Sequence, residues 1–271
     1  MSELLRRARL VVAYHGASFR GFAANTGVRT VLGDLASEFE RILRRPVSLT
    51  GAGRTDAGVH AWGQVISTDL PADTDLDDLV RRLNKLCAPD IAIRDAEWVA
   101  PDFDARFSAT WRRYRYHVWN HPAPNPLVAD TVWHVPRTLD LDAMRRATRD
   151  LVGEHDFTSF CRRPKVSEDA PEPSMTRIVH EASWTIADDP SLIRFDIRGS
   201  AFCHQQVRSM VGTLVDIGLG RLSDDSIPAI LEAHDRVAAG GVAPPEGLVL
   251  WEVGYDGARW DARPEPGDDL R

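Results

Sequence analysis

The sequence predicts an α/β (α+β) protein in which strands alternate with amphipathic helices. Several segments repeat apolar residues at helical spacing, others alternate with a period of two, and Gly- or Pro-rich turns separate them. The chain has 271 residues, of which 43% are hydrophobic and 27% charged. It is therefore long enough to bury a substantial core and has the composition of an ordinary globular protein.

The N-terminal part predicts strands and helices in alternation. Thr30 is expected to cap a helix, because a threonine hydroxyl accepts hydrogen bonds from the first unpaired N–H groups of a helix. Pro46 is expected to end this helix, since proline has no N–H to donate. The elements expected in this part are strands at residues 10–14, 47–50 and 64–68 and helices at residues 30–45 and 75–86.

A second part is expected to start near Arg112. Tyr114, Tyr116 and Val118 alternate with polar residues, which is typical of a half-buried strand. The other elements expected here are helices at 140–151 and 204–218 and paired strands at 178–186 and 192–198. We divide the chain into subdomains at residues 1–105 and 106–261, similarly built, with a mobile loop at 164–173 and a disordered tail at 262–271.

Several classes of protein are excluded. No stretch approaches the ~18 apolar residues of a membrane span, and the apolar run after residues 1–9 is too short for a secretory signal, so we expect a cytoplasmic protein. The cysteines Cys87, Cys161 and Cys203 form no Cys-x-x-Cys pair, which argues against a disulfide framework. The histidines show no metal-ligand spacing, so no zinc site is expected.

The most distinctive segment is residues 51–60, Gly-Ala-Gly-Arg-Thr-Asp-Ala-Gly-Val-His. Its small residues allow a tight turn and the close approach of a bulky ligand. Asp56, with Arg54 two positions before it, is thus placed to contact something other than the core. The alternative is a structural turn with a solvated ion pair.

With four further segments, this loop resembles the tRNA pseudouridine synthase A (TruA) family. These segments are residues 103–116, 153–160, 201–212 and 245–248, and they follow the order of the family. The resemblance implies the pseudouridine synthase fold, with two similar subdomains, a mixed and mainly antiparallel sheet flanked by helices, and a central RNA-binding cleft. It implies an isomerase that converts uridine to pseudouridine in the anticodon stem-loop of tRNA, forms a homodimer and uses no cofactor or metal.

The resemblance assigns catalytic roles to three residues. Asp56 is the nucleophile, which attacks either C1′ of the ribose or C6 of the base. Arg208 pairs with Asp56 and keeps it ionised, whereas its helix position alone favours a side chain that reaches to water. Tyr114 stacks on the base and assists proton removal from C5. Strand pattern alone does not separate Tyr114 from Tyr116, and a strand aromatic usually fills a core.

Four more residues are expected to bind the RNA. Arg54 enters the stem when the target nucleotide is flipped out, although a simple phosphate contact is the alternative. Leu248 lines the uracil site, or is plain core by composition, and Arg106 and Phe107 line the RNA cleft. The segment 23–28 departs from the family pattern, as does the run around residues 202–206.

Charge and chemistry leave alternatives open. The net charge of −7 argues against nucleic acid, but arginines gather within or beside the signature segments, which allows a basic groove on an acidic body. A pseudouridine synthase acting on another RNA and a non-catalytic RNA-binding or tRNA-folding protein are the main alternatives. A glycosidase would need a second acid ~5–9 Å from the first, and no signature segment offers one.

Overall fold

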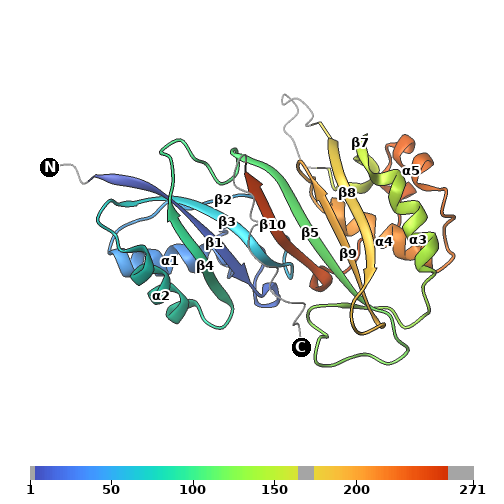
Figure 1. The fold of residues 1–271 in the computed structure, drawn as a ribbon, viewed down its shortest axis with the longest axis horizontal. Helices are drawn as coiled ribbons and strands as arrows, with labels where there is room; N and C mark the ends of the chain where they lie inside the picture. The colour runs from blue at the N-terminus through green and yellow to red at the C-terminus, as the bar shows by residue number, and fades with distance from the viewer. Residues whose placement is uncertain (1–3, 164–173, 256–271) are drawn as a thin grey trace. The chain divides into compact units, whose positions relative to one another are not determined.

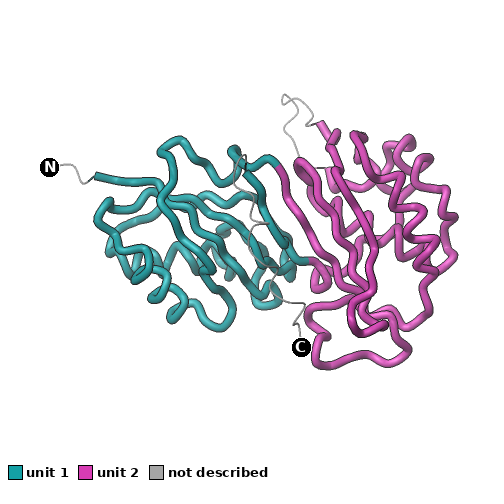
Figure 2. Tube along the Cα trace, in the orientation of Figure 1, with its two compact units in different colours: residues 1–110, 249–263 teal, residues 111–248, 264–271 magenta. Residues whose placement is uncertain are grey.

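The computed structural model describes residues 4–163 and 174–255, which divide into two compact units (Figures 1 and 2). The described part of unit 1 is residues 4–110 and 249–255, and that of unit 2 is residues 111–163 and 174–248. The loop expected at 164–173 and the tail expected at 262–271 lie outside the described residues. No helix of the described residues is long and apolar enough to cross a membrane.

Unit 1 is a sheet with strand order β4-β1-β3-β10, and β2 pairs with β3. β1 is antiparallel to both β3 and β4, whereas β10 is parallel to β3. The strands are β1 (Leu5–Tyr14), β2 (Thr50–Gly51), β3 (His60–Pro71), β4 (Ile91–Trp98) and β10 (Leu248–Tyr255). The helices are α1 (Val31–Leu43) and α2 (Leu76–Cys87), and Gly16–Ser18 form the 3-10 turn η1.

Both helices of unit 1 are capped by a side chain, one of them at Thr30 as expected. The Thr30 hydroxyl accepts from Gly33 N–H, and the Asp75 carboxylate accepts from Asp78 N–H. Both helices bury apolar residues, among them Leu35, Phe39, Leu79 and Leu83, each of which contributes about 1.5–3 kcal/mol on burial. Asn84 of α2 makes two hydrogen bonds to the backbone of Ile93, which fixes this helix on β4.

Unit 2 has the strand order β5-β9-β8-β7, and β6 pairs with β5. β5–β9, β9–β8 and β8–β7 are antiparallel. The strands are β5 (Ala109–Trp119), β6 (Trp133–His134), β7 (Gly153–Asp156), β8 (Thr176–Ile186) and β9 (Leu192–Gly199). The α-helices are α3 (Leu141–Thr148), α4 (Gln206–Gly218) and α5 (Ile227–Ala233), and the 3-10 turns are η2 (Arg149–Leu151), η3 (Thr158–Phe160), η4 (Arg236–Ala238) and η5 (Pro245–Gly247).

The two faces of the unit 2 sheet differ. Along β9, Ile193, Phe195 and Ile197 are buried and alternate with half-buried polar residues. The Trp184 indole on β8 donates to the Thr148 hydroxyl of α3 at 3.0 Å, so a helix covers the apolar face. The α+β class with mainly antiparallel strands is confirmed, and the central RNA-binding cleft stays a prediction.

One expected strand is wrong and three helices are shorter than expected. The helix expected at 30–45 ends at Leu43, because Arg44 has a left-handed backbone (φ 55), so the helix stops before Pro46. Of the strand expected at 47–50, only Thr50 pairs with β3, together with the following Gly51, because the chain approaches the sheet from Pro46, which cannot donate to a ladder. The helix expected at 204–218 starts at Gln206, since Gln205 has a left-handed backbone (φ 65). The helix expected at 140–151 ends at Thr148 and continues as η2.

Candidate active site

The glycine-rich loop runs from β2 to β3 and is tied to β3 at its beginning. Ala52 N–H donates to the carbonyl of Val65 at 2.8 Å. The side-chain amide of Gln64, which is fully buried, donates to the carbonyl of Gly53 at 2.9 Å. A buried amide without a partner is costly, so this contact fixes both the amide and the loop.

A second anchor holds the middle of the loop. The hydroxyls of Tyr14 and Thr55 lie 2.7 Å apart, and both residues are buried. The carbonyl of Thr55 accepts from Phe22 N–H at 3.1 Å. Because Thr55 is held inward, its neighbours face outward, with Arg54 exposed and Asp56 half-buried. The structure therefore places the Asp56 carboxylate on a fixed loop at the protein surface.

The end of the loop passes very close to another backbone segment. Gly58 has φ +82, a conformation that L side chains rarely adopt. A Cβ at Gly16 would overlap the carbonyl oxygen of Val59, and Gly16 N–H donates to Nδ1 of His60 at 3.0 Å. Glycine at position 16 is thus required for the loop to return into β3.

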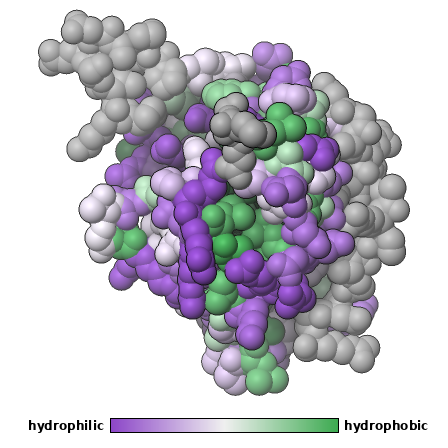
Figure 3. Space-filling view, turned by 90° about the vertical axis from the view of Figure 1, so that its left-hand side faces the viewer, coloured by the Kyte–Doolittle hydropathy of each residue, from purple (hydrophilic) through white to green (hydrophobic). Residues whose placement is uncertain are grey.

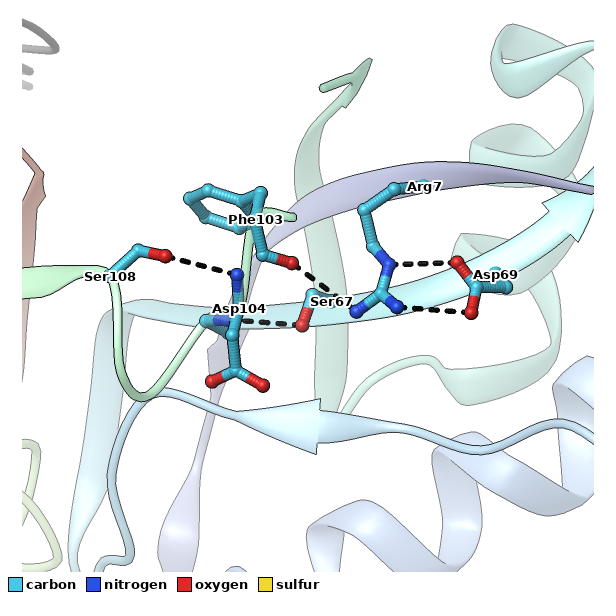
Figure 4. A network of polar contacts seen from close by, with 7 residues as sticks. Arg7, Ser67, Asp69, Phe103, Asp104 and Ser108 are labelled. Carbon is cyan, nitrogen blue, oxygen red and sulfur yellow. Dashed lines mark hydrogen bonds and ion pairs between the residues drawn. The ribbon is translucent and has the colours of Figure 1, made fainter. Parts of the chain in front are cut away.

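Arg106 and Phe107 lie on the turn of residues 103–108. A polar network holds this turn: Asp104 N–H donates to the Ser108 hydroxyl at 3.0 Å, and the Arg7 guanidinium donates to the carbonyl of Phe103 at 3.2 Å (Figure 4). The Asp104 carboxylate accepts from the N–H groups of both residues, at 2.8 and 2.9 Å. Ala105, between them and Asp104, donates to the Ser67 hydroxyl of β3 at 3.0 Å. Phe107 is 80% exposed at the tip of this turn, and the Arg106 guanidinium lies 5.3 Å from its ring centroid. The turn thus presents an exposed ring and a cation on a rigid support.

The two tyrosines of β5 have different environments. Tyr116 is fully buried, and its hydroxyl donates to the carbonyl of Pro244 at 2.8 Å. Burial raises the pKa of the Tyr116 phenol far above its usual range. Tyr114 is half-buried and makes an edge contact with Phe202, with ring centroids 5.3 Å apart. Tyr116 is therefore a core residue, and Tyr114 is the one that keeps access to a ligand.

Arg208 is half-buried on α4, and the backbone of Ala243 fixes its guanidinium group. Its Nε donates to the carbonyl of Ala243 at 2.7 Å, and Ala243 N–H donates back to the Arg208 carbonyl at 3.0 Å. A guanidinium has five N–H donors, so this contact orients the group and uses one of them. An arginine whose guanidinium simply reaches to water would not need this contact with the backbone.

Leu248 is buried at the start of β10, with 6% of its surface exposed. A Cβ at the preceding Gly247 would lie 2.6 Å from the Tyr116 ring. The backbone leading to Leu248 thus packs directly on the core tyrosine.

The seven predicted site residues are shared between the units. Four lie in unit 1: Arg54, Asp56, Arg106 and Phe107. Three lie in unit 2: Tyr114, Arg208 and Leu248. The ion pair between Asp56 and Arg208 stays a prediction.

Sequence analysis missed the residues that position the loop. Tyr14 and Gln64 hold Thr55 and Gly53, yet neither was given a role. The signal was present for Gln64, because a glutamine directly before the apolar pair Val65 and Ile66 of a buried strand needs a buried partner.

A basic hollow lies between α1 and α2 of unit 1, and none of the seven predicted residues lines it. Its volume is about 560 Å³. It is lined by Arg41, Ile42, Asp78, Arg81, Arg82, Lys85 and Leu86, so that cations outnumber the acidic residue. Figure 3 looks at unit 1 from the left of Figure 1 and shows apolar surface surrounded by hydrophilic surface.

A family model described as tRNA pseudouridine synthase matches residues 147–256. Two similar proteins are the tRNA pseudouridine synthase A of Cutibacterium acnes (40% identical, covering 93% of this chain and 89% of that protein) and of Bacillus subtilis (38%, 92% and 99%). That of a Caulobacter strain is 41% identical, covering 93% of this chain and 98% of that protein.

The class is therefore that of the pseudouridine synthases, which are isomerases. The chain belongs to the tRNA pseudouridine synthase A family. One chain of a solved structure, the crystal structure of a Cbf5-Nop10-Gar1 complex, is 12% identical with a TM-score of 0.30, over 77% of this chain and 53% of that one. A likeness this low carries no weight for the fold.

Proposed function

We propose that this chain converts uridine to pseudouridine in the anticodon stem-loop of cytoplasmic tRNA, with Asp56 as covalent nucleophile. The observation that carries the proposal is the loop itself. Buried contacts from Tyr14 and Gln64 fix the residues around Asp56, while the carboxylate stays half-buried at the surface. A nucleophile needs both a fixed position and access to its substrate.

Arg208 is proposed to hold the Asp56 carboxylate in its ionised form. An opposite charge close to a carboxylate favours the charged form and so keeps the nucleophile active. The support is the Ala243 carbonyl, which orients Arg208 through Nε. The reaction is an isomerisation, which leaves the oxidation state and the atoms of the uridine unchanged, so it calls for no cofactor in principle.

Five residues are proposed to receive the flipped-out uridine and the RNA around it. Tyr114 would stack on the base, since its ring is half-buried, whereas Tyr116 is buried and its hydroxyl donates to the carbonyl of Pro244. Leu248 would supply an apolar wall. Arg54, exposed beside the nucleophile, would enter the stem and offset part of the cost of flipping, which is a few kcal/mol. Phe107, with Arg106 beside it, would stack on an unpaired base.

The basic hollow is proposed as a further contact with RNA phosphates. α1 begins next to the segment that holds Thr55, because Val31 and Leu32 N–H donate to Gly21 and Phe22. Arg41 lies ten residues along this helix, which is about 15 Å at 1.5 Å per residue. A structured RNA that reaches the loop is large enough to reach the hollow as well.

The direct test maps pseudouridine at single-nucleotide resolution after incubation with unmodified tRNA. The wild-type protein should form it in the anticodon stem-loop, and Asp56→Asn, which is isosteric but not nucleophilic, should form none. Asp73→Asn, at an exposed turn of the same unit, is the matched control and should be fully active. Full activity of Asp56→Asn would remove the assigned nucleophile.

The same assay separates the alternatives. A non-catalytic RNA-binding or tRNA-folding protein would leave every uridine unchanged, and an enzyme for another RNA would modify ribosomal RNA fragments in preference to tRNA. A homodimer is also proposed, on the basis of the family. Sedimentation equilibrium should then give twice the 30.2 kDa chain mass, whereas a single chain mass at micromolar concentration would contradict it.

A further inference from the structure

Two of the three cysteines, distant in sequence, meet at the start of α4. Cys161 follows η3 and is 1% exposed, whereas Cys203 is half-buried. The side-chain oxygen of Gln206 contacts both. It accepts from Cys203 N–H at 2.8 Å, and Sγ of Cys161 donates to it weakly at 4.0 Å. One amide oxygen therefore holds both residues at the same point of unit 2.

The backbones that carry the two cysteines are also adjacent. Arg162 N–H donates to the carbonyl of His204 at 3.0 Å, and these two residues directly follow Cys161 and Cys203. Sγ of Cys203 donates weakly to the carbonyl of Met175 at 3.9 Å, and each thiol lies close enough to the other to shift its pKa. A disulfide needs a Cα separation of about 4.4–6.8 Å, and the hydrogen bond between Arg162 and His204 holds the two cysteine-bearing backbones side by side.

The two thiols are not equivalent. The contact with Cys161 lowers the pKa of Cys203, and the charge of Arg177 lowers it further, against the opposing effects of burial and of Asp156. The same contact and burial raise the pKa of Cys161. Cys203 is thus both the more exposed thiol and the one that ionises first, which are the properties of an attacking cysteine. Cys161 is the more deeply buried of the two thiols and would act as the resolving cysteine.

We propose that Cys161 and Cys203 form a redox-active dithiol, which a peroxide converts into an intramolecular disulfide. The Cys203 thiolate attacks the peroxide, an S–O bond forms, the O–O bond breaks, and the leaving oxygen departs as water after protonation. The Cys161 thiol then loses its proton and attacks the Cys203 sulfur, so that an S–S bond forms, the S–O bond breaks and a second water leaves. The peroxide is reduced and the two thiols are oxidised. This dithiol is independent of the proposed function.

The test treats the folded full-length protein with hydrogen peroxide, alkylates the remaining thiols, and digests it with trypsin without reduction. The expected product links the peptide of residues 150–162 to that of residues 199–208, and reduction should separate them. Cys203→Ser should leave Cys161 alkylated. Cys161→Ser should leave Cys203 as a sulfenic acid that dimedone traps. Cys87→Ser is the matched control and should give the linked peptide unchanged, because burial raises the pKa of Cys87 to about 11 and keeps it unreactive.

Two results would overturn the proposal. In the first, both cysteines are fully alkylated after peroxide treatment and dimedone labels nothing in Cys161→Ser. In the second, a mixture of isotope-labelled and unlabelled protein gives linked peptides of mixed mass, which would mean that the bond joins two chains.

Discussion

At the scale of single residues, the two tyrosines of β5 should separate stability from chemistry. Tyr116→Phe removes a buried hydrogen bond to Pro244 and leaves that carbonyl unsatisfied, which should cost about 1–3 kcal/mol in the free energy of unfolding. Its kcat should stay close to that of the wild type. Tyr114→Phe should lower kcat, since stacking survives and any proton transfer does not. Urea unfolding and single-turnover assays of both variants measure the two effects. Equal kcat values would remove Tyr114 from the chemistry.

Arg208 offers a second test at this scale. Arg208→Ala should lower kcat by about 10²-fold or more, the usual cost of losing one group that stabilises charge in an active site. Arg208→Lys retains the charge but not the Nε contact with Ala243, so its kcat should lie between that of the wild type and that of Arg208→Ala. Single-turnover rates with saturating RNA measure this order, and wild-type turnover by the alanine variant would contradict it.

Glycine should be required at position 16 because the backbone of Val59 leaves no room for a side chain, and not because this position needs a flexible backbone. In Gly16→Ala the new Cβ meets the carbonyl of Val59, which is backbone and cannot move alone. We expect a loss of about 1–3 kcal/mol in the free energy of unfolding, as for other overpacked sites. The control is Gly241→Ala, where a Cβ meets nothing within 4 Å, and its urea midpoint should equal that of the wild type. An unchanged midpoint for Gly16→Ala would show that the loop can yield.

At the scale of elements, the turn of residues 103–108 should act through its rigidity. Asp104→Ala removes the acceptor of the Arg106 and Phe107 N–H groups, so the exposed ring would lose its fixed position. We expect a several-fold rise in the Kd for tRNA, because an ordered side chain costs less entropy on binding than a mobile one. Asp104→Asn keeps one acceptor oxygen and should bind RNA like the wild type. Fluorescence anisotropy with labelled tRNA decides, and equal affinity of all three proteins would exclude this role.

The same scale shows what the sequence could predict. The helix α1 was predictable because the cap at Thr30 and the apolar period agree, and α2 was predictable from its apolar period, to which the structure adds a cap at Asp75. The absence of a full strand at 47–50 was not predictable, since an alternation of apolar and polar residues does not show whether a partner strand is present. Of the site, the carboxylate loop was recognisable from its small residues. The strand pattern could not choose between Tyr114 and Tyr116, because a period of two puts both on one face; the choice of Tyr114 came from the family resemblance.

At the scale of the whole molecule, a net charge of −7 must be reconciled with a polyanionic substrate. Local concentration of positive charge is the physical solution, because a field decays within about 10 Å at 0.1 M salt and the RNA senses only the nearby groups. The basic hollow is such a concentration. Arg81 and Arg82 both contact Asp78, the acidic residue that lines it, and Lys85 adds a further cation.

The hollow therefore gives the last prediction. Arg81→Glu with Arg82→Glu changes the net charge from −7 to −11, since each substitution removes one positive charge and adds one negative charge. If both arginines contact phosphates, the slope of log K against log salt should become shallower by about two. Arg137→Glu with Arg149→Glu makes the same change in net charge at exposed positions of unit 2 and should keep the wild-type slope. Anisotropy titrations from 50 to 300 mM KCl, roughly the range where such slopes are measured, provide the values. Equal slopes for the two double variants would mean that the RNA responds to total charge and that the hollow binds no phosphate.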